Sequence, residues 1–172
     1  MKYNKYKYQK YDKNYPRLFS KEKSRLKKFL PKEVIIEHVG SSSVPGLGGK
    51  GIIDIVVFCK RNQIAGIMKL LTNNKYEYNP NTADDKRKFF SRRVLHKEKE
   101  RRVHLHLTSN KETFNSFIAF RYYLIKHNDV RNEYAKIKKE GSKISRGNKE
   151  KYNEQKMDFL TETAKKAILE LK

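Results

Sequence analysis

The chain has 172 residues, of which 37% are hydrophobic and 35% are charged, and this length suits one domain with a sizeable core better than two. It has no apolar run of about 20 residues that would span a membrane, no apolar segment of a secretory signal, and a single cysteine, Cys59, which excludes a disulfide framework. We therefore expect one domain over residues 1–172, located in the cytoplasm without a membrane partner.

The net charge of +22 would attract RNA or another polyanion in a salt-dependent manner. Because the lysines are dispersed along the chain, a solvated charged surface is the favoured interpretation. The exception is a Tyr/Lys-rich leader at residues 1–16, where tyrosines could stack on bases while lysines contact phosphates. The same leader could instead pack against the domain.

Apolar periodicity and turn residues divide the chain into helices and strands. In chain order they predict a helix at 20–31 with Ser20 as its N-cap, strands at 33–39 and 51–58, a helix at 63–74, a turn region at 76–85, strands at 88–95 and 102–109, and helices at 113–127, 129–141 and 149–172. Strands in the first two-thirds and helices in the last third predict an α+β fold, with helices packed on a small mixed sheet.

The stretch HVGSSSVPGLGGKGIIDIVV, residues 38–57, places one carboxylate, Asp54, inside a strand of β-branched residues. A buried ionised carboxylate is unfavourable unless a partner compensates its charge. Gly46, Gly48 and Gly51 match the dinucleotide-binding pattern G-x-G-x-x-G, but a strand follows them where that motif needs a helix. The spacing of a P-loop is absent as well.

A different arrangement fits this stretch, in which a turn holds phosphate and the next strand holds a metal ion. Backbone N–H groups and hydroxyls at Gly40, Ser41 and Ser43 can bind phosphate oxygens. Asp54 can hold the divalent cation that neutralises those phosphates, and Lys50 can supply a further positive charge. The alternative is a structural turn followed by a capping carboxylate.

The same residues resemble the signature of a known family. IEHVGSSSVPGLGGKGIIDI, residues 36–55, is similar to the first motif of the GrpB family, also called UPF0157. KFFSRR, RRVHLHL, FNSFIAFRYYLIKH and KYNEQKMDFL resemble later motifs of that family in the same order. On these motifs the chain is identified as a member of the GrpB family over residues 31–160.

The resemblance implies a nucleotidyltransferase-like fold, in which the Gly-Ser turn precedes the acidic strand. In active nucleotidyltransferases the turn binds a triphosphate, and two carboxylates of the acidic strand hold two metal ions that clamp the attacking and leaving oxygens. The position two residues after Asp54 is Val56. The second carboxylate is therefore absent here, as it is from the family signature.

Glu37, His104 and His106 could complete a metal site with Asp54. The two histidines are two residues apart on one predicted strand, so both rings should project from the same face. A carboxylate with two imidazoles suits zinc or manganese better than magnesium. The alternative is that these histidines are satisfied by hydrogen bonds or line an anion site as cations.

Two arginines fall on positions of the family motifs, Arg101 in RRVHLHL and Arg121 in the first late helix. An arginine fork suits phosphate well, and Arg92 and Arg93 on the preceding strand are further candidates for binding an anionic substrate. Each of the four could equally be a surface arginine.

Three functions are consistent with these residues. The first is a metal-dependent enzyme that transfers a nucleotidyl group to an unknown acceptor, with Asp54 and Glu37 at the reaction centre and the Gly-Ser turn, Lys50, Arg101 and Arg121 on the phosphates. The second is a binding module that holds a nucleotide or phosphorylated metabolite without chemistry. The third is an RNA-binding protein that uses its basic surface.

Overall fold

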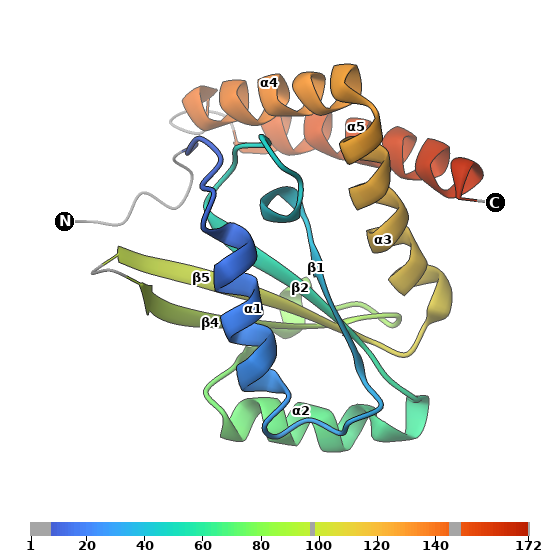
Figure 1. Ribbon diagram of the computed structural model, residues 1–172. Coiled ribbons are helices and arrows are strands. Elements are labelled where there is room, and N and C mark those ends of the chain that lie inside the picture. Colours follow the sequence, from blue (N-terminus) through green and yellow to red (C-terminus); the bar gives the residue numbers. More distant parts are fainter. Residues whose placement is uncertain (1–7, 97–98, 145–148, 172) are drawn as a thin grey trace.

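The computed structural model describes residues 8–96, 99–144 and 149–171, which form one five-stranded mixed sheet flanked by helices (Figure 1). The strands are β1 (Ile35–Val39), β2 (Ile52–Phe58), β3 (Glu77–Tyr78), β4 (Lys88–His96) and β5 (Lys99–Thr108), and the α-helices are α1 (Tyr15–Leu26), α2 (Ile64–Asn73), α3 (Lys111–Lys126), α4 (Asn128–Ile144) and α5 (Lys149–Glu170). The strand order is β1-β2-β5-β4-β3, with β2 and β5 parallel and the other neighbours antiparallel. The predicted α+β class, with its helical C-terminal third, is confirmed.

One face of the sheet forms the main apolar core with α1 and α2. Alternate residues of a strand point to opposite faces, and Ile53, Ile55 and Leu105 on the central strands are buried against Tyr15 of α1 and Leu71 of α2. The free thiol of Cys59 is buried in the same core.

Helix α1 begins at Tyr15, so the predicted start at Ser20 was wrong. Pro16 lies in the first turn of the helix, where its missing N–H leaves no hydrogen bond unmade and its φ already suits a helix. Tyr15 and Leu18 are both buried, so the apolar stripe of the helix extends upstream into the leader.

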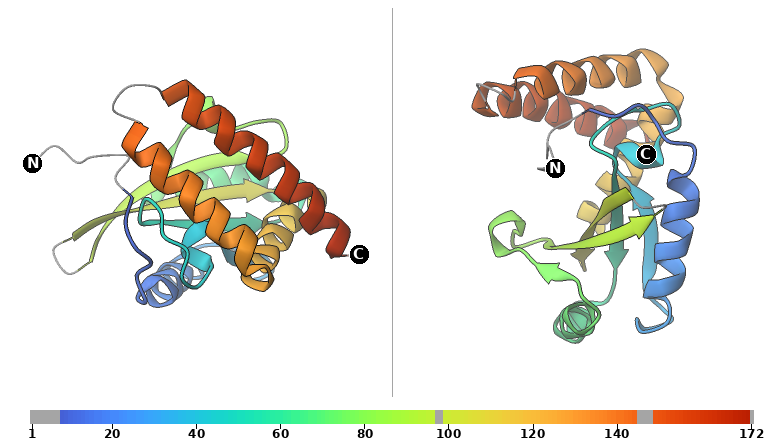
Figure 2. Two further views of the ribbon diagram at one scale, coloured as in Figure 1. Left: turned by 90° about the horizontal axis from the view of Figure 1, so that it is seen from above. Right: turned by 90° about the vertical axis from the view of Figure 1, so that its left-hand side faces the viewer.

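The opposite face of the sheet and one of its ends are covered by the C-terminal helices. Helix α3 packs on β1, β2 and β5, while α4 and α5 run side by side beyond one end of the sheet (Figures 1 and 2). A second apolar cluster of Val44, Leu47, Leu124 and Tyr134 joins these helices to the loop between β1 and β2. The Gly-Ser turn is therefore enclosed between the sheet and the helices.

The strand pair β4–β5 is longer than predicted. Both strands extend into the charged connection at residues 96–100 and pair from Lys88↔Leu107 to His96↔Lys99. The predicted turn region at 76–85 contains β3 at the sheet edge and a single 3₁₀ turn at Pro80–Thr82.

The described part of the leader packs against the domain. Gln9 and Gly49 exchange two backbone hydrogen bonds of 2.7 and 2.9 Å, and the carboxylate of Asp12 pairs with the buried guanidinium of Arg101. Residues 8–16 of the leader therefore pack against the domain, which was one of the two possibilities for this segment. Residues 1–7 of the predicted RNA-binding leader lie outside the described residues.

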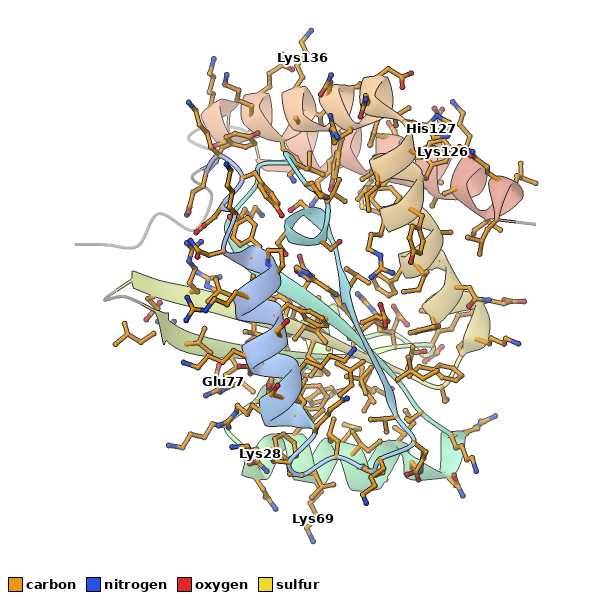
Figure 3. All side chains as sticks on the ribbon, viewed as in Figure 1. Lys28, Lys69, Glu77, Lys126, His127 and Lys136 are labelled. Atoms are coloured by element: carbon orange, nitrogen blue, oxygen red, sulfur yellow. The ribbon has the colours of Figure 1, made fainter. Side chains whose placement is uncertain are left out.

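Many lysines are spread over the outside of the molecule. Lys28, Lys69 and Lys136 come from three different parts of the fold and point away from its body (Figure 3), as a solvated charged surface requires. Among the described residues, no helix combines the length and the apolar character that crossing a membrane would need.

A buried charge pair ties α1 to β4. The carboxylate of Glu22, 6% exposed, accepts hydrogen bonds of 2.7 and 3.0 Å from Arg92 Nη1, and the Tyr76 hydroxyl donates a further one. Removing one partner of such a pair leaves the other charge buried without compensation.

We expect Glu22→Ala to lower the free energy of unfolding by about 3 kcal/mol, because Arg92 would lose its counter-charge. Glu33→Ala is the matched control, since Glu33 is exposed and the hydrogen bond that it accepts from Gln63 is exposed as well; about 0.5 kcal/mol is expected there. Urea unfolding of both variants measures the difference. Equal losses would contradict the role assigned to Glu22.

Candidate functional site

Asp54 lies in the middle of β2, on the face of the sheet opposite the main core. Its register partners are Val39 on β1 and His104 on β5, and His104 Nδ1 lies 3.4 Å from Asp54 Oδ1. Burial alone would raise the pKa of Asp54, but the hydrogen bond from His104 and the charges of His104, His106 and His38 outweigh it and lower the pKa below its usual value. The carboxylate is therefore ionised at neutral pH.

The Gly-Ser turn comes very close to this carboxylate. Gly40 has a φ of +68°, and a Cβ placed on it would lie 2.5 Å from Asp54 Oδ2 and 2.9 Å from Asp54 Cβ. The turn continues as a 3₁₀ turn over Ser41–Ser43, in which the Ser43 hydroxyl donates to the Gly40 carbonyl at 2.6 Å. Only glycine allows the backbone to pass this close to Asp54.

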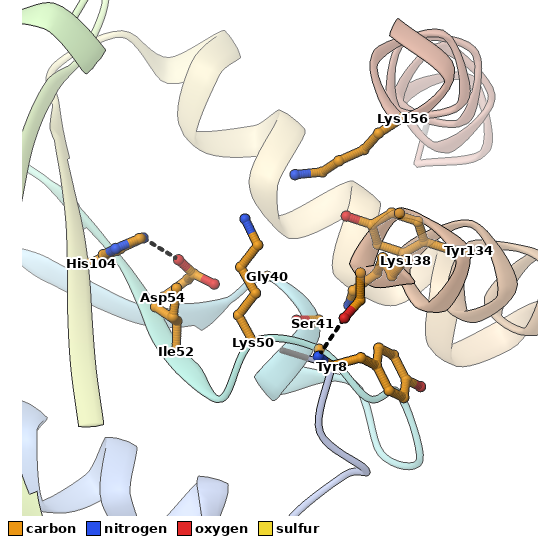
Figure 4. A pocket seen from close by; sticks show the side chains of 13 residues that line it. Tyr8, Gly40, Ser41, Lys50, Ile52, Asp54, His104, Tyr134, Lys138 and Lys156 are labelled. Carbon is orange, nitrogen blue, oxygen red and sulfur yellow. Dashed lines mark hydrogen bonds and ion pairs between the residues drawn. The ribbon is translucent and has the colours of Figure 1, made fainter. Parts of the chain in front are cut away.

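A cavity of about 190 Å³ opens between Asp54, the Gly-Ser turn and helices α4 and α5 (Figure 4). The charged and polar side chains that line it come from parts of the chain that are far apart in sequence: Tyr8, Ser41, Lys50, Asp54, His104, Tyr134, Lys138, Ser142 and Lys156. Figure 4 shows Lys50 beside Asp54, and Lys156 reaching from α5 toward the same space. Three ammonium groups thus share the cavity with one carboxylate.

Lys138 and Lys156 are two charged residues of this cavity that sequence reasoning missed. Lys138 is 8% exposed, donates to the Gly48 carbonyl at 2.5 Å and lies over the Tyr134 ring at 4.7 Å. Burial, helped by the charges of Lys156 and Lys50 and opposed by Asp54, lowers the pKa of Lys138 to about 7. Burial also lowers the pKa of Lys156, and Asp54 opposes that shift.

A weak signal for both lysines was present in the sequence. Tyr134 and Lys138 are four residues apart on α4, a spacing that places them on one helix face. Lys156 belongs to the stretch KYNEQKMDFL, whose resemblance to a family motif identified the region without giving that lysine a role.

The structure brings together only part of the predicted site. Gly40, Ser41, Lys50, Asp54 and His104 line the cavity. Ser43 is turned to the Gly40 carbonyl within the turn.

The other predicted residues have partners elsewhere. Glu37 accepts a hydrogen bond of 3.0 Å from Arg121, which also donates to the His38 carbonyl at 2.6 Å. Arg101 points to the opposite face of the sheet, where it pairs with Asp12.

His106 projects from the same face as His104, as predicted, but its Nδ1 lies 2.9 Å from Arg87 Nη1. Burial and the charges of Arg87 and His104 lower the pKa of His106 to about 4, although the charge of Asp54 opposes this shift. The ring is therefore neutral at pH 7. Within the residues that the structure describes, no three His, Cys, Asp or Glu side chains are grouped as metal ligands.

Three comparisons relate this chain to known proteins. The family model described as GrpB protein matches residues 6–166. The UPF0157 protein BH1888 of Halalkalibacterium halodurans is 30% identical over 161 residues, which are 91% of this chain and 80% of that protein. The crystal structure of the conserved protein GrpB from Enterococcus faecalis aligns at a TM-score of 0.79 and 24% identity, covering 96% of this chain and 99% of that one.

A more distant match is the Cid1 poly(U) polymerase, at a TM-score of 0.43 and 12% identity over 74% of this chain and 44% of that chain.

We expect Gly40→Ala to destabilise the protein by about 3 kcal/mol, because it combines backbone strain with a clash against Asp54. Gly46→Ala is the control, since Gly46 also has a positive φ, +81°, but nothing lies within 4 Å of its added Cβ; about 1 kcal/mol is expected. Chemical denaturation compares the two. An equal loss of unfolding free energy in both variants would mean that Asp54 moves aside at no cost, and it would contradict the predicted clash.

Lys138 predicts a pH dependence of stability. Its pKa of about 7 in the folded protein lies below the ordinary 10.5, so between these values the unfolded chain holds more protons than the folded one. The free energy of unfolding should therefore rise with pH from 7 to 9, by up to about 1 kcal/mol per pH unit.

The measurement is urea unfolding of the wild type and Lys138→Met at several pH values in this window. The unfolding free energy should rise more steeply with pH in the wild type than in Lys138→Met. The lost hydrogen bond to Gly48 should lower the stability of the variant by a similar amount at every pH, so it does not affect this comparison. Lys136→Met changes an exposed lysine of the same helix and should keep the wild-type slope. Identical slopes in wild type and Lys138→Met would contradict the assignment.

Proposed function

This chain belongs to the GrpB family, and we propose that it binds the polyphosphate group of a nucleotide in the cavity beside Asp54, together with a divalent metal ion. The proposal depends on one observation: Lys50, Lys138 and Lys156 line the same cavity as the ionised Asp54, beside the Gly-Ser turn.

The three lysines make the cavity suited to a polyanion. Enclosed like charges repel one another, and this repulsion contributes to the lowered pKa of Lys138. A polyphosphate supplies several acceptor oxygens and negative charges, so it could contact all three lysines at once and would favour their charged forms. The hydroxyl of Ser41 and the backbone N–H groups of the turn offer further donors.

The residues present fit magnesium or manganese better than zinc. Magnesium is usually held by one or two carboxylates and by substrate phosphates, and Asp54 supplies one such carboxylate at the cavity wall. Zinc prefers three or four protein ligands, whereas Glu37 and His106 are engaged by Arg121 and Arg87. A bound divalent ion would neutralise phosphate charge and act as a Lewis acid.

Transfer of a nucleotidyl group is the activity that the family resemblance suggests for this site. In that reaction the lysines would hold the leaving phosphates and stabilise their developing charge. His104, in contact with Asp54, would keep the carboxylate ionised and oriented toward the cavity.

A second candidate is nucleotide binding without chemistry. Val56 lies on the same face of β2 as Asp54 and is fully buried, so the strand offers no second carboxylate for a two-metal mechanism. Release of pyrophosphate from a bound triphosphate in the presence of candidate acceptors would favour transfer, and tight binding with no release would favour the binding module. RNA binding through the basic surface stays a prediction.

The test is isothermal titration of the metal-stripped protein with ATP, GTP, CTP, UTP and tripolyphosphate, with and without magnesium or manganese. We expect metal to tighten binding of a triphosphate to the wild type. In Asp54→Asn this gain should vanish, while metal-free binding of tripolyphosphate stays or becomes stronger, because a negative charge has left a basic cavity.

Two variants control for charge and for the fold. Lys156→Gln should weaken metal-free tripolyphosphate binding about tenfold, and Asp85→Asn, an exposed carboxylate outside the cavity, should change nothing. Absence of binding by every triphosphate and by tripolyphosphate, under all conditions, would overturn the proposal.

A further inference from the structure

A second cavity, of about 440 Å³, adjoins the first on the same face of the sheet. The two cavities share Lys50, Ile52 and His104 in their walls. Helix α3 covers this face of β1, β2 and β5, whereas the second cavity lies over β5, β4 and β3. The open half of the sheet therefore continues the space around Asp54.

Strand register places a row of polar side chains along this open face. Asp54 is opposite His104, His104 is opposite Ser91, and Ser91 is opposite Glu77. Because directly paired residues point to the same face, the row runs from the first cavity across the floor of the second. Asn79 and Thr82 add polar groups at the far wall.

The next row of the register brings two arginines together. Arg93 on β4 is directly opposite Arg102 on β5, and both line the second cavity. Arg93 is 69% exposed, and its ion pair with the partly exposed Glu100 is 3.4 Å long. The guanidinium of Arg93 is therefore accessible to a ligand.

We propose that the second cavity binds a phosphorylated sugar or a similar polyol phosphate, as the second substrate of the site beside Asp54. Each guanidinium presents a fork of N–H donors that suits phosphate oxygens, and two neighbouring arginines suit a phosphate monoester. Ser91, Asn79 and Glu77 offer hydrogen bonds to hydroxyl groups. A molecule held in this way extends from the arginine pair toward Asp54 and His104.

This inference rests on the proposed function, because it treats the first cavity as the binding place of the nucleotide phosphates. The size and chemistry of the two cavities agree with such a division. The smaller one, with three lysines, suits a compact polyphosphate, and the larger one combines cations with neutral and acidic groups.

The experiment titrates ribose 5-phosphate into protein that has been saturated with tripolyphosphate and magnesium, with binding followed by calorimetry. We expect saturable binding of ribose 5-phosphate and none of ribose, which lacks the phosphate. Arg102→Gln and Arg93→Gln should each weaken binding about tenfold. Arg17→Gln, an exposed arginine on α1 that lines neither cavity, should leave it unchanged.

Three outcomes would overturn the proposal: no binding of ribose 5-phosphate, binding that neither arginine variant weakens, or competition with tripolyphosphate, which would place the sugar phosphate in the first cavity. Because Arg93 is exposed, Arg93→Gln should fold normally, and it tests the proposal even if Arg102→Gln fails to fold. The tripolyphosphate titration that precedes each run reports on the first cavity alone, so a failure of the proposed function is seen separately.

Discussion

An ionised carboxylate in the middle of a sheet constrains everything around it. The hydrogen bond from His104, 3.4 Å away, and the neighbouring imidazoles of His106 and His38 hold the pKa of Asp54 below its usual value. Lysines line the space above the carboxylate. The bulk of the Asp54 side chain also requires that Gly40 carry no side chain, since the Gly40 backbone passes against the carboxylate. The Gly-Ser turn, strand β2 and helices α4 and α5 are thus arranged around a single acidic group.

Local patterns were sufficient to predict the half of this site that the sheet provides. The Gly-Ser turn, the strand around Asp54 and the shared face of His104 and His106 all follow from residue type and a period of two. That period also separates Arg101 from His104, because residues three apart on a strand point to opposite faces. Assigning Arg101 to the phosphates followed a family motif against this geometry, and the structure places it against Asp12.

The rest depends on contacts that no short stretch of sequence encodes. Lys138 and Lys156 reach the cavity because an apolar cluster of Val44, Leu47, Leu124 and Tyr134 seats the C-terminal helices over the loop after β1. Glu37 was predicted to bind a metal ion together with Asp54, but in the structure it pairs with Arg121 of α3. Which of two nearby charges a side chain pairs with is decided by tertiary packing, and so the predicted set of metal ligands was not assembled as a group in the described residues.

The composition of the cavity wall has a consequence for how the protein is made. The turn, Lys50, Asp54 and His104 are synthesised well before Lys138 and Lys156, so on an emerging chain the sheet presents one carboxylate with one of the three lysines of the cavity wall. The other two lysines arrive only when α4 and α5 leave the ribosome and dock. An incomplete chain that had already folded its sheet would therefore lack two of the three lysines that line the finished cavity.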